Sequence, residues 1–192
     1  MKFTKMHGCG NDYIYVDCFE QEVQSPEHLA VMLSDRHFSI GGDGVVLICP
    51  SKVADAKMRM FNLDGSEGLM CGNAIRCVGK YLHDIRGVQK KTLTIETRSG
   101  IKTLKLFTKD NLVVRAEVNM GKAEFSPEKI PVALPGDKII GQPAEIAGKE
   151  YQITCVSMGN PHCIVFGDDP SGLDLPAIGP KFEFNPLFPE RV

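Results

Sequence analysis

The sequence has no stretch of about 18 apolar residues, the length that a membrane-spanning helix needs, and no Lys/Arg run longer than two residues. Its net charge is −2 at pH 7. These features argue against a membrane span and against a nucleic-acid or anionic-membrane partner. The opening segment "MKFTKMHGCGNDYIYVDCF" lacks a continuous apolar segment and a small-residue cleavage site. We therefore expect it to form a strand and not a signal peptide.

Paired C-x2-C spacings are also absent from the seven cysteines, and His162–Cys163 is the only adjacent His/Cys pair. An odd number of cysteines without a secretory signal indicates reduced thiols in the cytoplasm. The sequence thus predicts a cytoplasmic protein with no metal site and no disulfide framework. Six cysteines are assigned to packing: Cys9, Cys18, Cys49, Cys77, Cys155 and Cys163.

What is present is a chain of 192 residues with 43% hydrophobic and 24% charged residues, ordinary for a globular protein with a sizeable core. Short strand-like segments dominate, and those between residues 92 and 121 are spaced like a meander or barrel wall. Ser25 before Pro26 predicts a helix start capped by the serine.

The composition of the sequence changes after Gly121, where "KAEFSPEKIPVALPGDK" is richer in proline and its apolar residues are less periodic. We predict two domains, residues 1–118 and 119–192. Within the second, the last segment, "LDLPAIGPKFEFNPLFPERV", is expected to be extended because of its prolines.

An internal similarity links residues 10–17, "GNDYIYVD", to residues 159–168, "GNPHCIVFGD". Each places Gly-Asn before an apolar strand that ends in Asp, and each follows another short strand. The sequence therefore predicts two copies of one supersecondary unit. In the first copy, Cys71 follows Gly10 at a fixed spacing in the sequence. The same spacing counted from Gly159 ends beyond Val192, so we expect the second copy to be incomplete.

A turn cluster in "DGSEGLMCGNAIRCVGKYLHDI" leads into Cys71 and a predicted central helix over residues 71–85. The unpaired N–H groups of an enclosed helix start attract an anion and favour a thiolate. Gly72 would let a ligand approach the backbone, and Asn62 and Asn73 could bind a carboxylate or an ammonium group. The alternative is an inert, buried cysteine. The apolar residues at helical spacing are Ala74, Ile75, Val78, Tyr81, Leu82 and Ile85. The thin polar face of this helix is expected to carry Asn73, Arg76, Lys80, His83 and Asp84.

Three segments in this order, "KMHGCGNDYIYVD", "DGSEGLMCGNAIRC" and "VSMGNPHCIVFGDD", resemble diaminopimelate epimerase. The resemblance runs from Met1 to the final "FPERV". It implies an α+β fold in which a mixed sheet or barrel wraps around a central helix, with this arrangement pseudo-duplicated and the second copy incomplete here. It also implies interconversion of LL- and meso-diaminopimelate for lysine and peptidoglycan synthesis, without a cofactor, in a cytoplasmic enzyme that commonly dimerises.

In that family two cysteines on opposite faces of the substrate α-carbon remove and return the α-proton. The resemblance gives Cys71 the role of the first cysteine and gives Gly72 and Asn73 contacts with the carboxylate. It assigns Asn11, Asn62 and Asn160 to the polar ends of the substrate, with turn geometry as the alternative. His162 corresponds to a histidine near the first cysteine, the alternative being a core histidine.

The sequence departs from the family pattern at several points. The later Cys-Gly-Thr-Gly segment, which carries the second cysteine, is not among these residues. Ala74 stands where the family usually has Gly, and Gly44 stands where some members have a polar side chain. We therefore expect the 192 residues alone not to epimerise.

Two other functions stay open at this point. One is an isomerase of the same fold, resembling proline racemase or a phenazine-biosynthesis isomerase. The other is a non-catalytic, amino-acid-binding half-domain that keeps only the carboxylate site.

Overall fold

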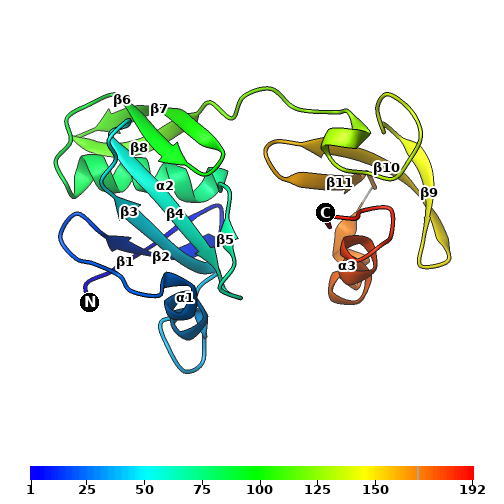
Figure 1. The fold of residues 1–192 in the computed structure, drawn as a ribbon, viewed down its shortest axis with the longest axis horizontal. Coiled ribbons are helices and arrows are strands. Elements are labelled where there is room, and N and C mark those ends of the chain that lie inside the picture. The colour runs from blue at the N-terminus through cyan, green and yellow to red at the C-terminus, as the bar shows by residue number, and fades with distance from the viewer. Residues whose placement is uncertain (168) are drawn as a thin grey trace. The chain divides into compact units, whose positions relative to one another are not determined.

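The computed structural model describes residues 1–167 and 169–192. These residues form two compact units, Met1–Met120 and Gly121–Val192, which are described separately (Figure 1). Asp168, the last residue of the predicted second repeat, lies outside the described residues.

The first unit is built on one mixed sheet in the order β1-β2-β3-β4-β6-β7-β8, with β5 added to β4. The neighbours β2 and β3 are parallel, as are β4 and β6, and the other pairs are antiparallel. The meander predicted after residue 92 is confirmed as β6-β7-β8. The strands are β1 (Thr4–Gly8), β2 (Asn11–Asp17), β3 (Gly44–Cys49), β4 (Ala56–Asn62), β5 (Glu67–Gly68), β6 (Thr92–Thr97), β7 (Gly100–Lys109) and β8 (Leu112–Val118).

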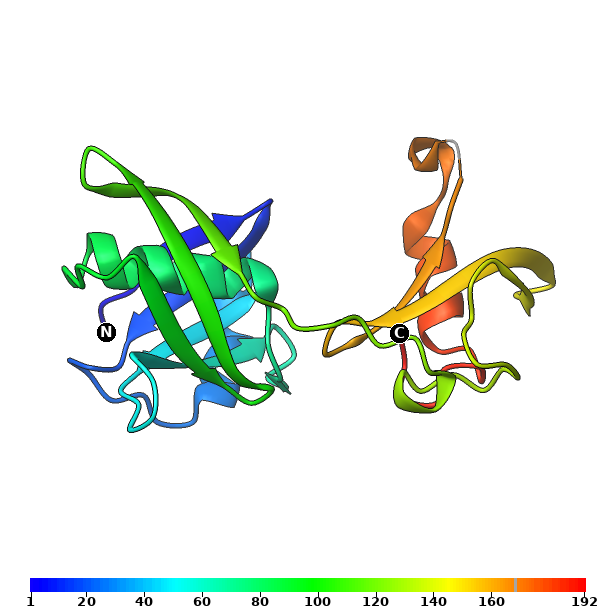
Figure 2. The same ribbon diagram turned by 90° about the horizontal axis from the view of Figure 1, so that it is seen from above.

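Helix α2 (Gly72–Asp84) is the central helix of this unit, and Figure 2 shows it between the blue β1–β2 hairpin and the green β7 and β8 strands. Its apolar stripe packs against the sheet, as the spacing predicts. Two positions differ from the prediction. Ile85 follows the helix and is 57% exposed, whereas His83, expected on the polar face, is buried with Nδ1 2.9 Å from Asp84 Oδ1. This structure confirms the predicted fold class of a mixed sheet curled around a helix.

Both faces of the central strands are buried, which explains the unbroken apolar run in β2. Tyr13 and Tyr15 face α2, while Ile14 and Val16 belong to a separate cluster that includes Ala30 of the helix α1 (Pro26–Ser34).

Helix α1 begins at Pro26 as predicted, but the expected serine cap is wrong. Ser25 has φ 46° and ψ 60°, and its side chain makes no capping hydrogen bond. An N-cap residue normally has an extended backbone, which directs its side-chain oxygen at the first free N–H groups, and this left-handed conformation does not.

The second unit has a three-stranded antiparallel sheet in the order β11-β10-β9. Its strands are β9 (Gln142–Ile146), β10 (Lys149–Ser157) and β11 (Pro161–Val165). Its helices are α3 (Leu175–Glu183) and two short 3-10 helices, η1 (Pro127–Lys129) and η2 (Pro170–Gly172). The core is formed by Ile130, Val132, Ile139, Ala144, Ile146, Ile153, Cys155 and Phe188.

Helix α3 corrects the prediction of an extended C-terminal segment. Asp174 caps it by accepting a hydrogen bond from Ala177 N at 3.2 Å. Pro176 lies in the first turn, where no intrahelical N–H partner is needed. The Asp-Leu-Pro sequence was therefore a helix-start signal that the proline count obscured.

Each of the two segments of the internal repeat forms the turn and the second strand of an antiparallel hairpin. Asn11 opens β2 after the β1–β2 turn, and Pro161 opens β11 after the turn at Gly159 and Asn160, each in an antiparallel hairpin. Glycine permits the positive φ of both turns, 86° at Gly10 and 109° at Gly159.

Candidate active site

Cys71 is the N-cap of α2, with an extended backbone at φ −132° and ψ 118°. Its Sγ accepts a hydrogen bond from Ala74 N at 3.4 Å, and its carbonyl accepts one from Ile75 N at 3.0 Å. The amides of Gly72 and Asn73 come first in the helix and have no intrahelical acceptor. The helix thus presents N–H donors and the positive end of its dipole beside the half-buried thiol.

Asn11 lies beside this thiol. Its Nδ2 is 3.8 Å from Cys71 Sγ, and its buried Oδ1 has no hydrogen-bond partner in the described part of the chain. Buried acceptors are normally paired, so this oxygen is available to an N–H group of a ligand. The hairpin carrying Asn11 comes close to α2 at Gly8, where an added Cβ would lie 3.1 Å from Asn73 O.

Arg76 is a cation of the site, one helical turn after Gly72. Its Nη2 donates to Asn73 Oδ1 and, at 3.6 Å, to Cys9 Sγ, while its Nε donates to Gly72 O at 3.1 Å. The guanidinium therefore holds Asn73 in place and adds positive charge near the first turn. Cys9 is exposed in the β1–β2 turn, so its assignment to packing is wrong.

Asn62 is not in hydrogen-bond contact with Cys71 or Asn11. Its Nδ2 donates to Ser66 Oγ at 3.0 Å, its N–H donates to Ser66 O and its carbonyl accepts from Gly65 N, both at 2.9 Å. These contacts form a turn, the structural role that was the alternative to substrate binding for Asn62. A substrate contact by Asn62 stays a prediction.

Asn160 and His162 belong to the second unit, in and just after the β10–β11 turn. Both are exposed, and His162 pairs with Val156 across the ladder. The alternative of a core histidine is therefore wrong for His162. Its proposed place near Cys71 stays a prediction.

Tyr13 is a residue of this site that the sequence motifs did not reveal. It is 5% exposed and belongs to the core cluster against which Cys71 packs. Burial, followed by the charges of Cys71 and Asp43, raises the pKa of Tyr13 to about 12. The signal in the sequence was strand periodicity, because residue 13 faces the same side of β2 as residue 11.

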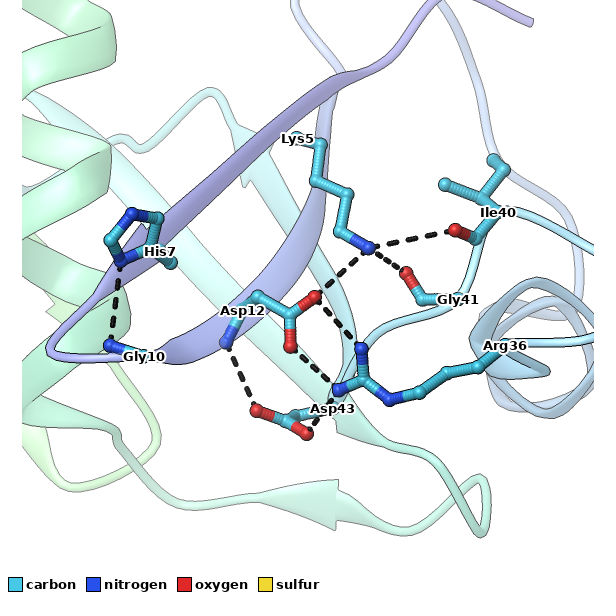
Figure 3. Close-up of polar contacts among 8 residues, drawn as sticks. All are labelled: Lys5, His7, Gly10, Asp12, Arg36, Ile40, Gly41 and Asp43. Atoms are coloured by element: carbon cyan, nitrogen blue, oxygen red, sulfur yellow. Dashed lines mark hydrogen bonds and ion pairs between the residues drawn. The ribbon is translucent and has the colours of Figure 1, made fainter.

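An ion cluster next to Asn11 fixes the start of β2 (Figure 3). Arg36 donates two hydrogen bonds to Asp12, from Nη2 to Oδ1 at 2.7 Å and from Nη1 to Oδ2 at 3.2 Å. Its Nη2 also donates to Asp43 Oδ1 at 2.9 Å. Lys5 Nζ is 2.9 Å from Asp12 Oδ2, and Asp12 N donates to Asp43 Oδ2 at 3.0 Å. The cluster ties the β1–β2 hairpin to the loop before β3.

Replacing Arg36 with methionine should make the free energy of unfolding depend less on pH in the acidic range. Hydrogen bonds from Arg36 and then Lys5 hold the pKa of Asp12 well below its usual range. A lowered pKa stabilises the fold above the unfolded-state pKa of about 4, and this stabilisation is lost as the pH falls. Because Arg36 is 54% exposed, we expect Arg36→Met to lower the free energy of unfolding only slightly at neutral pH.

Urea unfolding of wild type and variant from pH 7 to pH 2 would measure this difference, which should shrink toward low pH. Arg115→Met, which removes a single exposed pair with Glu117, is the control and should cost less. If Arg36→Met lost the same free energy of unfolding at every pH in this range, the variant would contradict the conclusion that Arg36 lowers the pKa of Asp12.

No group of three or more His, Cys, Asp or Glu side chains in the described residues is arranged to hold a metal ion. Among these residues, no helix is long and apolar enough to cross a bilayer.

Comparison with known proteins places this arrangement in a family. Residues 3–126 match the family described as "Diaminopimelate epimerase". The diaminopimelate epimerase of Acetivibrio thermocellus is 53% identical over 192 residues, covering 100% of this chain and 69% of the relative. This chain belongs to the diaminopimelate epimerase family. The enzyme of the same description from Methanococcus maripaludis strain S2 is 51% identical over 194 residues, covering 100% of this chain and 69% of that one.

Solved structures with lower identity share the fold of these epimerases. A probable proline racemase from Agrobacterium radiobacter K84 has a TM-score of 0.62 at 16% identity, over 92% of this chain and 52% of that one. A PhzF-family phenazine biosynthesis protein from Bacillus anthracis has a TM-score of 0.56 at 22% identity, over 86% and 56%. The chain thus spans just over half the length of these two proteins.

Proposed function

We propose that this protein acts as a diaminopimelate epimerase, interconverting the LL and meso forms of 2,6-diaminopimelate without a cofactor, and that Cys71 is its first proton-transferring residue. The observation that carries the proposal is the thiol at the open start of α2, beside the unpaired Asn11 Oδ1. An amino acid brings both matching groups, a carboxylate for the helix N–H groups and an N–H donor for Asn11.

In this mechanism the Cys71 thiolate takes the α-proton of the bound substrate. Negative charge then develops on the α-carbon and its carboxylate, and the Gly72 and Asn73 amides, the helix dipole and Arg76 stabilise it. A proton delivered to the opposite face completes the inversion. That step needs a second acid, which we propose comes from a Cys-Gly-Thr-Gly segment not present in these 192 residues.

Following the family resemblance, we also propose that Asn160 binds the substrate and that His162 helps to set the protonation state of Cys71. The division into domains 1–118 and 119–192, the homodimer and the cytoplasmic location are likewise proposals that rest on the family resemblance.

Protection of Cys71 from alkylation tests the substrate assignment on the 192-residue chain. Diaminopimelate should slow carboxymethylation of Cys71, followed by peptide mass spectrometry, whereas proline at the same concentration should not. Protection by proline alone would instead favour the proline-racemase-like function, which the shared fold suggests. Cys18, which is half-buried and packs on the α1 side of the sheet, reports any general change in reagent access.

A binding half-domain is the second candidate, because α2 is the only helix of the described residues that starts with Cys-Gly. The 192 residues alone should give no LL-to-meso conversion by chiral chromatography. Diaminopimelate affinity that is unchanged in Cys71→Ala, without α-proton exchange in D2O, would favour this candidate over a catalytic role. Measurable turnover by the 192 residues would contradict the need for a second thiol.

A further inference from the structure

Two free cysteines of the second unit, Cys155 and Cys163, face each other across neighbouring strands. Cys155 on β10 and Cys163 on β11 are direct Cα partners in the antiparallel ladder (Figure 1). Side chains of directly paired residues lie on the same face of a sheet, and both cysteines belong to or pack against the apolar cluster around Ile153. The β10–β11 hairpin therefore brings together two thiols that have no part in the proposed function.

The backbone hydrogen bonds of β10 identify the kind of pair that these residues form. Cys155 N donates to Ile139 O at 2.9 Å, and Ser157 exchanges two backbone hydrogen bonds with Glu124, also at 2.9 Å. Cys155 thus directs its backbone groups away from β11, and it forms a non-hydrogen-bonded pair with Cys163. In such a pair the Cα atoms are about 4.5 Å apart and the side chains are closest. A disulfide bond needs Cα atoms about 4.4–6.8 Å apart, so it can form here without a change of register.

The two thiols differ in their access to solvent. Cys155 is 0% exposed, whereas Cys163 is half-buried and lines a hollow of about 450 Å³ between the sheet and α3. Tyr151 and Val165 line this hollow from the sheet, and Phe182 lines it from α3. The pKa of Cys163 is raised, first by the Cys155 side chain and then by burial, so this thiol is neutral near pH 7. A small oxidant can reach Cys163 through the hollow, and Cys155 is then the thiol beside it.

We propose that Cys155 and Cys163 are an oxidation site, at which a peroxide converts the two thiols into a reversible cross-strand disulfide. The Cys163 thiolate attacks a peroxide oxygen, and the O–O bond breaks to give a sulfenic acid and hydroxide. The Cys155 thiol then attacks the Cys163 sulfur, so that an S–S bond forms, the S–O bond breaks and water leaves. Both thiols are oxidised, and one hydrogen peroxide is reduced to two molecules of water. The bond closes the hairpin segment that carries Asn160 and His162, because both lie between the two cysteines.

Peptide mapping of the 192-residue chain after treatment with hydrogen peroxide tests this site. Trypsin cuts after Lys149 and Lys181, so Cys155 and Cys163 lie in one peptide that contains no other cysteine. The treatment is made at mildly alkaline pH, where more of the thiol is ionised, and free thiols are then alkylated. We expect this peptide to lose two hydrogen atoms and to take up no alkyl group. Reduction with dithiothreitol before alkylation should restore both alkylation sites.

Three variants separate this bond from general oxidation. Cys163→Ser should leave Cys155 as a thiol, because Cys155 is 0% exposed. Cys155→Ala should carry Cys163 on to the sulfinic acid, located by fragmentation of the peptide, because no neighbouring thiol captures the sulfenic acid. Cys49→Ser, which replaces a half-buried cysteine of the first unit, is the matched control and should leave the bond unchanged.

Two outcomes would overturn the proposal. One is a disulfide that forms in urea but not in the folded chain, because the β10–β11 ladder would then not hold the two sulfurs together. The other is oxidation of Cys163 to the sulfinic acid at the same rate in wild type and in Cys155→Ala, because Cys155 would then not capture the sulfenic acid.

Discussion

Cys71→Ser is expected to reduce epimerisation by about 10²- to 10⁴-fold, the usual contribution of a positioned general base. Serine keeps the size of the side chain, and its Oγ can still accept the hydrogen bond that Ala74 N now gives to Cys71 Sγ. Helix α2 should therefore retain its start. A hydroxyl, however, is far less acidic than a thiol and does not supply an anionic base near neutral pH.

The measurement requires a chain that can turn over. A chimera that joins these 192 residues to the rest of the Acetivibrio thermocellus epimerase, beyond the region of 53% identity, would supply it. Cys18→Ser in the same chimera is the control, because Cys18 packs on the α1 side of the sheet. Conversion of LL- to meso-diaminopimelate by Cys71→Ser at more than about a tenth of the unmutated rate would contradict the assigned role.

The sequence predicted the central helix and the strands well because those signals are local. The apolar spacing after Cys71 predicts α2, and the opening segment predicts a strand. The structure adds that β2 is buried on both faces, with Tyr15 in one cluster and Ile14 in another. The position of Cys71 at the helix start also follows from local sequence, since the turn before it ends where the periodicity begins.

Contacts between distant segments could not be predicted in this way. Arg36 meets Asp12 because the loop before β3 lies beside the β1–β2 hairpin, and no motif in the chain specifies that approach. The same is true of Tyr13, whose neighbour Cys71 comes from another element. His83 looked exposed from helical spacing alone, but the residues around it bury it.

Gly44 is one position where local conformation and the site depend on the same residue. Gly44→Ala should destabilise the first unit by about 3 kcal/mol or more, because two costs combine. The backbone at φ 152° disfavours any side chain, and the added Cβ would lie 2.0 Å from the Phe61 carbonyl. That carbonyl belongs to the strand that pairs with β3, where Gly44 faces Asn62, so relief of the clash separates the ladder.

Gly100→Ala is the matched control, because Gly100 also has a positive φ, 96°, but a Cβ there would meet nothing within 4 Å. It should cost only the backbone strain, about 1–2 kcal/mol. Urea unfolding followed by circular dichroism would compare the two variants, and hydrogen exchange would locate the loss in β3 and β4. Equal costs would mean that the contact with Phe61 relaxes freely. A larger cost in Gly44→Ala would show that the same glycine holds the ladder together and leaves space for the Tyr13 ring, 2.9 Å from the added Cβ.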